Sequence, residues 1–357
     1  MSGEKTSGND PEAAGFNRRE ALKRVGTGGL SVLGAGVVIG SLGSRAAAGD
    51  DGPGSPGDGQ SDEYGAGLLS DELPVGAAAG PYGGEYAPPE HIAADALDHL
   101  TFPPAPRSGT VEVEMAVVEV PIEVSRAHIV AGWAYNGTAP GPTIRATEGD
   151  LIRVLFSNRT NHEHNLHFHG SHSPQHDGWE PIPPGGETVY EIVAGPAGVH
   201  PYHCHTMPID RHISKGLYGT LIVDPPEARP NAHEVVLALS GWDIDDDGHN
   251  ELYSWNGIAG FFQKYPIKVP AGELVRAYVL NMTEFDPIAS FHLHAQTFAV
   301  YPAGMGSEPA FASDVVTFGQ MDRAILEFEL PQRGRYMFHP HQHSIAQRGA
   351  MGWFSAI

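Results

Sequence analysis

The sequence predicts an all-β protein made of two copies of one β-sandwich. Apolar and polar residues alternate over short runs such as residues 111–124, which is the period of a strand with one buried face. Gly, Pro and Asn separate these runs, and long helical periodicity is absent. An Asn-Gly turn at Asn136, followed by Gly149, recurs at Asn256, followed by Gly272. Turn residues that recur at matching positions indicate a tandem repeat of one sandwich.

The predicted strands fall into two sets with a boundary near residue 226, where an Asp-Pro-Pro sequence interrupts the pattern. We therefore expect one domain over residues 108–226 and a second over 227–357. Each set contains four clear strands, at residues 111–124, 150–156, 188–193 and 219–223 in the first and 234–239, 265–269, 273–280 and 324–330 in the second.

The N-terminal region carries a predicted export signal over residues 1–48. Arg18 and Arg19 precede an apolar run, and three alanines end it, which is typical of a twin-arginine signal. A transmembrane anchor is the alternative, but six glycines interrupt the run of residues 25–42, which favours the signal. Residues 49–107 are predicted to be a disordered acidic linker followed by a Pro-rich N-terminal extension, with a short helix within residues 88–100.

The charge balance limits the partners of this chain. It has 43 Asp and Glu against 21 Lys and Arg, a formal net charge of −22. Nucleic acids and anionic membranes attract positive surfaces, so we expect neither as a partner. Because the short apolar run is interpreted as a signal, we expect no membrane span in the mature chain. An acidic surface of this kind favours a high-salt habitat. The single cysteine excludes an intrachain disulfide, which leaves packing and metal binding to stabilise the fold.

That cysteine, Cys204, lies between two histidines, His203 and His205. On a strand, Cys204 would point to one face and the histidines to the other, so one strand could contact two metal sites. Three more His-x-His pairs occur at matching places of the two repeats. A pair at i and i+2 presents two imidazoles to one side, and a thiolate with imidazoles suits copper. The other three pairs are His167 with His169, His292 with His294, and His339 with His341.

Taken together, the motifs of residues 108–357 resemble those of the two-domain multicopper oxidases. The segment from Asn136 to Arg145, the histidines that follow His164, and the stretch from His203 to Leu217 carry this resemblance. The resemblance implies cupredoxin-like Greek-key domains with one type 1 copper, in the first domain, bound by His164, Cys204 and His212. The axial position falls at Leu217, which cannot ligate copper; Met207 and Met351 are less favoured axial candidates.

The resemblance also implies a trinuclear cluster of one type 2 and two type 3 coppers, shared between the two domains. His167 and His292 match the type 2 ligands, and the remaining six paired histidines match the type 3 ligands. Asp177, after the first His-x-His-Gly, matches a carboxylate that relays protons, although a turn-forming Asp is an equal reading. In the two-domain relatives each cluster lies between neighbouring subunits of a homotrimer, so we expect the same assembly.

The implied reaction is laccase-like: a small reducing substrate gives up single electrons, and O₂ is reduced to water. Copper nitrite reductase is one alternative, but in those enzymes the residue matching His167 is an aspartate that serves catalysis and the residue matching His205 is not a ligand. A non-enzymatic copper or electron-transfer protein is the second alternative. A metal-ion oxidase is a variant of the main interpretation, and the electron donor cannot be named from the sequence.

Smaller signals are expected to be structural. His172, His176 and His343 lie near the motifs and are interpreted as exposed loop histidines. The acidic segment from Asp243 to Glu251 resembles part of a calcium loop, but its twelfth position is Ser254 where such a loop has Glu, so we interpret it as a surface turn.

Overall fold

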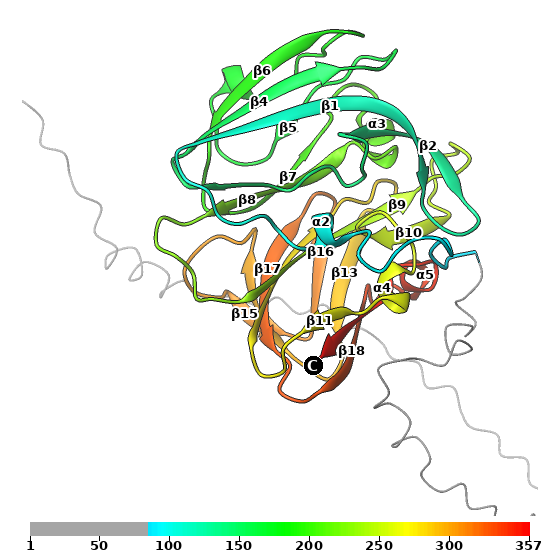
Figure 1. Cartoon of the computed structure of the whole chain (residues 1–357), viewed down its shortest axis with the longest axis vertical. Coiled ribbons are helices and arrows are strands. Elements are labelled where there is room, and N and C mark those ends of the chain that lie inside the picture. The colour runs from blue at the N-terminus through cyan, green and yellow to red at the C-terminus, as the bar shows by residue number, and fades with distance from the viewer. Residues whose placement is uncertain (1–84) are drawn as a thin grey trace, which may run out of the picture. The chain divides into compact units, whose positions relative to one another are not determined.

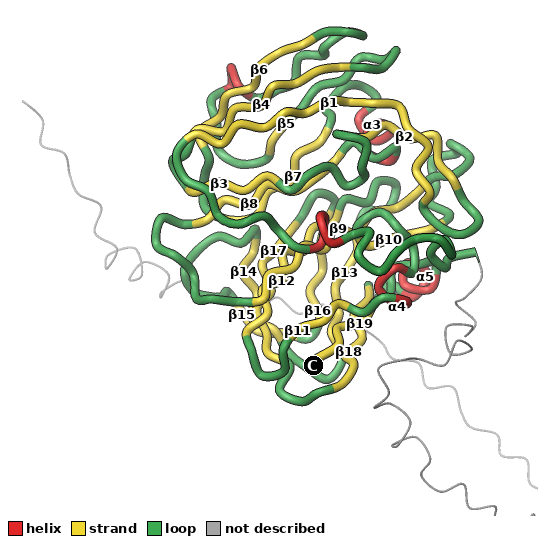
Figure 2. Tube along the Cα trace, viewed as in Figure 1, coloured by secondary structure: helices red, strands yellow, loops and turns green. Residues whose placement is uncertain are grey.

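The computed structural model describes residues 85–357. The predicted signal and the linker up to residue 84 lie outside the described residues. Strands are the main secondary structure of the described residues, and the helices there are short (Figure 2). Two β-sandwiches follow one another along the chain (Figure 1), which confirms the predicted all-β fold.

The first sandwich consists of two four-stranded sheets, with strand orders β2-β1-β4-β6 and β3-β8-β7-β5. A 3₁₀ turn and the helix α3 (Ile209–Ser214) lie in its loops. The strands are β1 (Thr110–Glu123), β2 (Ile129–Tyr135), β3 (Ile144–Thr147), β4 (Leu151–Asn158), β5 (His167–Phe168), β6 (Glu187–Val193), β7 (Gly198–His203) and β8 (Tyr218–Asp224).

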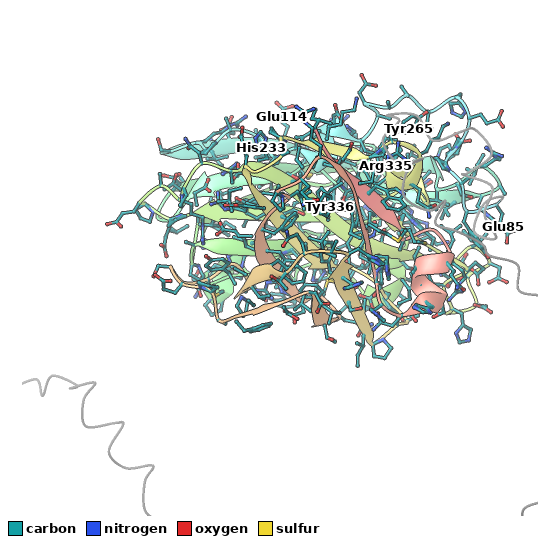
Figure 3. All side chains as sticks on the ribbon, turned by 90° about the horizontal axis from the view of Figure 1, so that it is seen from below. Glu85, Glu114, His233, Tyr265, Arg335 and Tyr336 are labelled. Atoms are coloured by element: carbon teal, nitrogen blue, oxygen red, sulfur yellow. The ribbon has the colours of Figure 1, made fainter. Side chains whose placement is uncertain are left out.

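The second sandwich consists of a six-stranded sheet, β10-β9-β12-β17-β14-β15, and a five-stranded sheet, β11-β19-β18-β13-β16. Side chains fill its interior, where Tyr336 of β18 is buried (Figure 3). The helices are α4 (Phe261–Lys264) and α5 (His343–Gln347). The strands are β9 (His233–Trp242), β10 (Leu252–Trp255), β11 (Ile267–Val269), β12 (Leu274–Asn281), β13 (Ile288–Leu293), β14 (Phe298–Pro302), β15 (Phe311–Ser313), β16 (Val315–Gly319), β17 (Arg323–Glu329), β18 (Gly334–His339) and β19 (Gly352–Ala356).

The two sandwiches share local details as well as their layer plan. Asn136 and Asn256 both adopt a positive φ, of 56° and 55°, in their Asn-Gly turns. The Oδ1 atom of each accepts a backbone N–H, from Ala116 in one sandwich and Ala238 in the other. Because the same side chain makes the same bond at the same place, these turns set the same strand connection in both sandwiches.

An apolar layer and a buried ion network join the sandwiches. β7 and β8 pack their outer face on β9, β12 and β17 through buried side chains that include Val199, Ile222 and Tyr278. Arg145 of β3 bonds to Asp224 at the end of β8 and to Glu234 of β9, across the junction. Burial of these charges is tolerated because each has a charged partner within hydrogen-bond distance.

Residues 85–107, the described part of the predicted extension, run along both sandwiches. Within it lies α2 (Asp98–Thr101), inside the predicted helical stretch, and Leu97 and Leu100 enter the core of the second sandwich. The carbonyl oxygen of Arg107 accepts a hydrogen bond from Thr147 Oγ1 of the first sandwich.

Candidate metal centre

The cysteine site lies at the end of β7. Strand β7 ends at His203, and Cys204 follows it with its side chain buried in the first core. Its Sγ is 3.2 Å from His212 Nδ1 and 3.8 Å from His164 Nδ1, and the two Nδ1 atoms are 3.1 Å apart. His212 is supplied by α3 and His164 by the loop between β4 and β5. The fold therefore gathers one thiol and two imidazoles around one point.

These three side chains suit a soft metal ion. All are 5% exposed or less, and His164 Nε2 is buried without a hydrogen-bond partner. Burial lowers the pKa of His164 to about 3 and of His212 to about 4, so both imidazoles are neutral and ready to ligate. Burial also raises the pKa of the Cys204 thiol. Two imidazoles and one sulfur are the donor set of blue copper sites.

Leu217 lies beside this site with a fully buried side chain in the same core cluster as Cys204. Its carbonyl oxygen accepts the backbone N–H of Cys204, and its own N–H donates to the carbonyl of His212. Leu217 thus holds the backbone on both sides of the site. Of the two methionines considered for the axial position, Met207 has an exposed side chain, at 76%.

Four histidines form a second cluster on the opposite side of Cys204. His167 of β5 is the cross-strand partner of His203 in β7. His169 Nε2 lies 3.1 Å from His203 Nε2, and the rings of His167 and His205 are 5.2 Å apart. Burial lowers the pKa of His169 to about 3 and of His203 to about 4. Ring nitrogens of His167, His169 and His203 lie within 4.8 Å of one another, close enough to hold one metal ion.

The second sandwich repeats this arrangement. His292 of β13 is the cross-strand partner of His339 in β18. His294 Nε2 lies 3.0 Å from His339 Nε2, and the rings of His292 and His341 are 5.2 Å apart. Pro340 occupies the place of the cysteine, so this sandwich carries the histidine cluster without a thiol.

Backbone carbonyls fix which ring nitrogen of these histidines is free. His203 Nδ1 donates to the carbonyl of Cys204, and His339 Nδ1 donates to that of Pro340. His167 Nδ1 donates to the carbonyl of Asp177, as His292 Nδ1 does to that of Asp314. Because a carbonyl can only accept, Nδ1 carries the hydrogen, and Nε2 keeps the lone pair that a metal requires.

Within residues 85–357, no hydrogen bond or ring contact joins the histidine cluster of the first sandwich to that of the second. Each cluster brings ring nitrogens of three histidines within 4.8 Å of one another. The fourth histidine, His205 in the first cluster and His341 in the second, joins by ring contact. The described part of the chain therefore presents two separate groups of imidazoles.

Comparison with known proteins identifies the family. Residues 116–228 and 238–356 match two family profiles, both described as multicopper oxidase. One solved structure, the crystal structure of a multicopper oxidase, superimposes on this chain with a TM-score of 0.69 and 39% sequence identity. The match covers 74% of this chain and 97% of the other protein. The chain belongs to the multicopper oxidase family.

Two curated relatives extend this result. The copper-containing nitrite reductase of Neisseria meningitidis serogroup A is 29% identical over 268 residues, 68% of each chain. The L-ascorbate oxidase of Cucumis sativus is 40% identical over 120 residues, 30% of this chain and 20% of that protein. The nitrite reductase alternative is not better supported, since both profiles and the structure above are of multicopper oxidases.

The family fixes the fold, the cofactor and the reaction class of this multicopper oxidase. Its sandwiches are cupredoxin folds, and its cofactor is copper of types 1, 2 and 3. The reaction is the one-electron oxidation of a reducing substrate coupled to the four-electron reduction of O₂ to water.

Asp177 lies against the first histidine cluster. Its Oδ1 is 3.3 Å from His167 Nδ1 and 3.7 Å from His172 Nε2, and its side chain is 40% exposed. His172 differs from the expectation of an exposed loop residue, because its side chain is only 10% exposed. The loop folds back so that His172 Nε2 donates to the carbonyl of Phe168.

The other loop histidines remain exposed. His176 is bonded through Nδ1 to Ser173 Oγ, away from both clusters. His343, at the start of α5, stacks on His341 with ring centroids 5.6 Å apart. His343 therefore lies near the second cluster, but its ring nitrogens are not among those that lie within 4.8 Å of one another there.

The acidic segment forms a turn that its own side chains stabilise. Asp243 accepts the backbone N–H groups of Asp247 and Gly248, and Glu251 accepts that of Ile244. Oxygens of Asp243, Asp245 and Glu251 also lie within 4.8 Å of one another. Lys215 of the first sandwich pairs with Asp246, so the turn contacts the segment that follows α3.

Three residues that contact the candidate ligands were not predicted from the sequence. Trp133 of β2 lies with its ring centroid 4.9 Å from that of His164 and 4.7 Å from that of His212. Asn165 Oδ1 accepts the backbone N–H of His205 at 2.6 Å, and Ser290 Oγ accepts that of His341 at 2.8 Å. Only the folded arrangement brings these side chains to the ligands.

Proposed function

We propose that the chain is an exported, laccase-like oxidase whose type 1 copper is bound by Cys204, His164 and His212. The buried thiol with two neutral imidazoles supports this assignment. A bound copper would have the buried Leu217 beside it where an axial ligand could stand, and a leucine side chain would not ligate it. The trinuclear cluster is held by the eight paired histidines, with His167 and His292 on the type 2 ion and the others on the type 3 pair.

The observation that carries this proposal is the peptide link between the two kinds of site. Cys204 faces His164 and His212, whereas its neighbours His203 and His205 face the first histidine cluster. Bound copper supplies one-electron transfer at the cysteine site and O₂ reduction at the cluster. One residue thus separates the ligand of the first site from ligands of the second, which is a short covalent path for electrons.

The chain's own residues provide the remaining functions. Carbonyls of Cys204, Asp177, Pro340 and Asp314 hold the imidazoles in the tautomer that exposes Nε2. Asp177, partly exposed and 3.3 Å from His167 Nδ1, can pass protons between solvent and the cluster.

We also propose that the functional unit is a homotrimer, in which the first sandwich of one subunit meets the second sandwich of its neighbour. The separation of the two groups of imidazoles, each a half-set of the proposed cluster ligands, supports this assembly. In a closed ring of three chains, each head-to-tail contact brings two half-sets together. A monomer would hold only incomplete clusters and would be inactive.

The activity is tested by copper content and by product. We expect four copper ions per chain, O₂ uptake with a phenolic donor, and no NO from nitrite. Nitrite turnover without O₂ uptake would favour the nitrite reductase alternative. Copper binding without any turnover would favour an electron-transfer protein.

The shared cluster is tested by complementation. His169→Ala disables the first half-set and His294→Ala the second, so each homotrimer is inactive. Coexpression at equal levels should restore about a quarter of the wild-type activity, because three quarters of random trimers are mixed and each has one intact cluster in three. Absence of restored activity in mixed trimers would show that the cluster is not shared between subunits.

We propose export by a twin-arginine signal in residues 1–48, since a cofactor-loaded oxidase suits a route for folded proteins. Among the residues that the structure describes, no helix is long and apolar enough to cross a membrane. The net charge of −22 supports a high-salt habitat. Activity retained at molar salt would agree with that habitat, and precipitation there would oppose it.

A further inference from the structure

Trp133 of β2 packs against both imidazoles of the cysteine site. The centroid of its ring is 4.9 Å from that of His164 and 4.7 Å from that of His212, with interplanar angles of 69° and 44°. Tilted and edge-on contacts at this separation are favourable for aromatic rings. The two imidazoles come from different segments, since His164 lies in the loop before β5 and His212 lies in α3. One indole therefore contacts two ligands that the chain supplies from separate elements.

The imidazoles of the cysteine site lack the hydrogen bonds that orient the other histidines. The Nδ1 atoms of His164 and His212 face each other and Cys204 Sγ. His164 Nε2 is buried without a hydrogen-bond partner, and within residues 85–357 no protein group hydrogen-bonds to His212 Nε2. The rings of His203 and His339, by contrast, are each anchored through Nδ1 by a backbone carbonyl. Packing against the indole therefore takes the place of such a bond at the cysteine site.

The backbone of β2 is fixed to the end of α3 at the position of this indole. The N–H of Trp133 donates to the carbonyl of Lys215, directly after α3, at 3.0 Å. A Cβ at Gly132 would lie 2.9 Å from that carbonyl, and a Cβ at Gly216 would lie 2.8 Å from the carbonyl of Trp133. Gly216 also has a φ of 115°, which other residues rarely adopt. Two glycines thus let the strand that carries Trp133 approach the helix that carries a ligand.

The indole also stands between the solvent and the inner ligand. A surface hollow with a cavity volume of about 230 Å³ is lined by Trp133 and His212 but not by His164, which is fully buried. His162, on the solvent side, packs on the same indole with ring centroids 4.9 Å apart. Because Trp133 contacts both the hollow and His164, removing the indole would extend the hollow to the His164 ring.

We propose that Trp133 is a positioning residue of the cysteine site, which holds both imidazoles in the orientation for copper and keeps water away from the ion. This inference rests on the proposed type 1 site. An apolar shell that excludes water disfavours the state of higher charge. With one thiolate and two neutral imidazoles, the site carries one positive charge with Cu(II) and none with Cu(I). Trp133 therefore favours the reduced site and raises its reduction potential.

Substitution of the indole in the copper-loaded full chain tests the proposal. In Trp133→Ala we expect a lower reduction potential, a shifted visible band and type 1 copper bound about 10-fold more weakly, as measured by competition with a chelator. Trp133→Phe keeps an aromatic ring against both imidazoles and should retain most of the wild-type potential and band. A Trp133→Ala protein with the wild-type potential and band would overturn the proposal.

A matched pair of variants separates positioning from ordinary core packing. Trp133→Leu keeps an apolar side chain and decides the question if Trp133→Ala does not fold. The control is Trp255→Leu, because Trp255 of β10 is buried in the core of the second sandwich, away from the cysteine site. Both variants should unfold at a lower urea concentration than the wild type. Only Trp133→Leu should change the potential and the band, and an unchanged potential and band in both would show that Trp133 is a core residue alone.

The wild-type protein separates this inference from the function on which it rests. If copper-loaded wild type shows no blue band and no type 1 spin-resonance signal, the proposed type 1 site fails. If both signals are present, the copper hyperfine splitting should differ between Trp133→Leu and wild type and should be the same in Trp255→Leu and wild type. The same splitting in all three proteins would overturn only the role of Trp133.

Discussion

Replacing Arg145 by Met should cost about 3–5 kcal/mol of unfolding free energy, because the change removes one partner of a buried ion network. The Arg145 side chain is 4% exposed and donates two hydrogen bonds to Asp224 and two to Glu234, at 2.7 to 3.0 Å. After the change Glu234 keeps Tyr278 and a 3.4 Å contact with Arg276, whereas Asp224 loses both of its donors. Two carboxylates would remain side by side at the junction of the sandwiches.

The pH dependence of this effect follows from the pKa of Glu234. Burial alone would raise that pKa, but hydrogen bonds from Arg145 and Tyr278 outweigh burial and lower it. Ionised Glu234 therefore stabilises the native state above its ordinary pKa, and this contribution is lost as the pH falls through the lowered value. In Arg145→Met the pKa should rise, so the penalty should be large at pH 7 and smaller near pH 4.

The assay is urea unfolding of copper-loaded protein at matched concentrations, at pH 7 and near pH 4. Arg153→Met is the control, because Arg153 is 42% exposed and pairs with Glu112 and Glu191 on the surface. Its loss should cost at most about 1 kcal/mol. If both variants lose the same stability at pH 7, the junction network does not contribute as reasoned.

Two further changes test individual side chains. Burial, and then the charge of Asp210, raise the pKa of Glu284 to about 7, so native stability should decline as pH rises from its ordinary pKa of 4.5 towards 7. Glu284→Gln should remove this decline and stabilise the protein at pH 8 by about 1–2 kcal/mol, after allowance for solvent screening, with little effect near pH 4. The measurement is urea unfolding of the variant and the wild type at both pH values. If the two proteins unfold at the same urea concentration at pH 8, the prediction is wrong. Leu217→Met should offer a thioether to the cysteine site, lower its redox potential and shift its visible band; an unchanged spectrum and potential would show that this side chain is not axial.

The sequence was sufficient for the fold wherever strands alternate apolar and polar residues. Each of the eight predicted strands has a counterpart, for example β12 at residues 274–281 for the expected 273–280. Strand β2 was not among the predicted strands; it contains Gly132, where a Cβ would lie 2.3 Å from Ile122 Cδ1. A glycine inside a strand marks a close approach that its neighbours in sequence do not reveal.

The site was predictable to the extent that its residues are chemically distinctive. A single cysteine and paired histidines can be recognised as candidate ligands from the sequence alone. Trp133 and Asn165 resemble any other Trp or Asn until the fold places them against those ligands. His172 shows the converse, since its burial depends on a loop that folds back onto Phe168. Tertiary contacts of this kind leave no spacing pattern.

Each histidine cluster has a side chain that accepts the backbone N–H of one of its histidines, and these two side chains differ in their other contacts. Ser290 Oγ holds the backbone of His341, and its contacts stay within the cluster side of the second sandwich. Asn165 Oδ1 holds the backbone of His205 and also accepts a contact from Cys204 Sγ at 3.4 Å. In the first sandwich one amide therefore fixes both the sulfur and a cluster histidine. A movement of Cys204 or of His205 would therefore disturb the other, so the cysteine site and the first histidine cluster are positioned together. The second sandwich has Pro340 in place of the cysteine, so its side chains position only a histidine cluster.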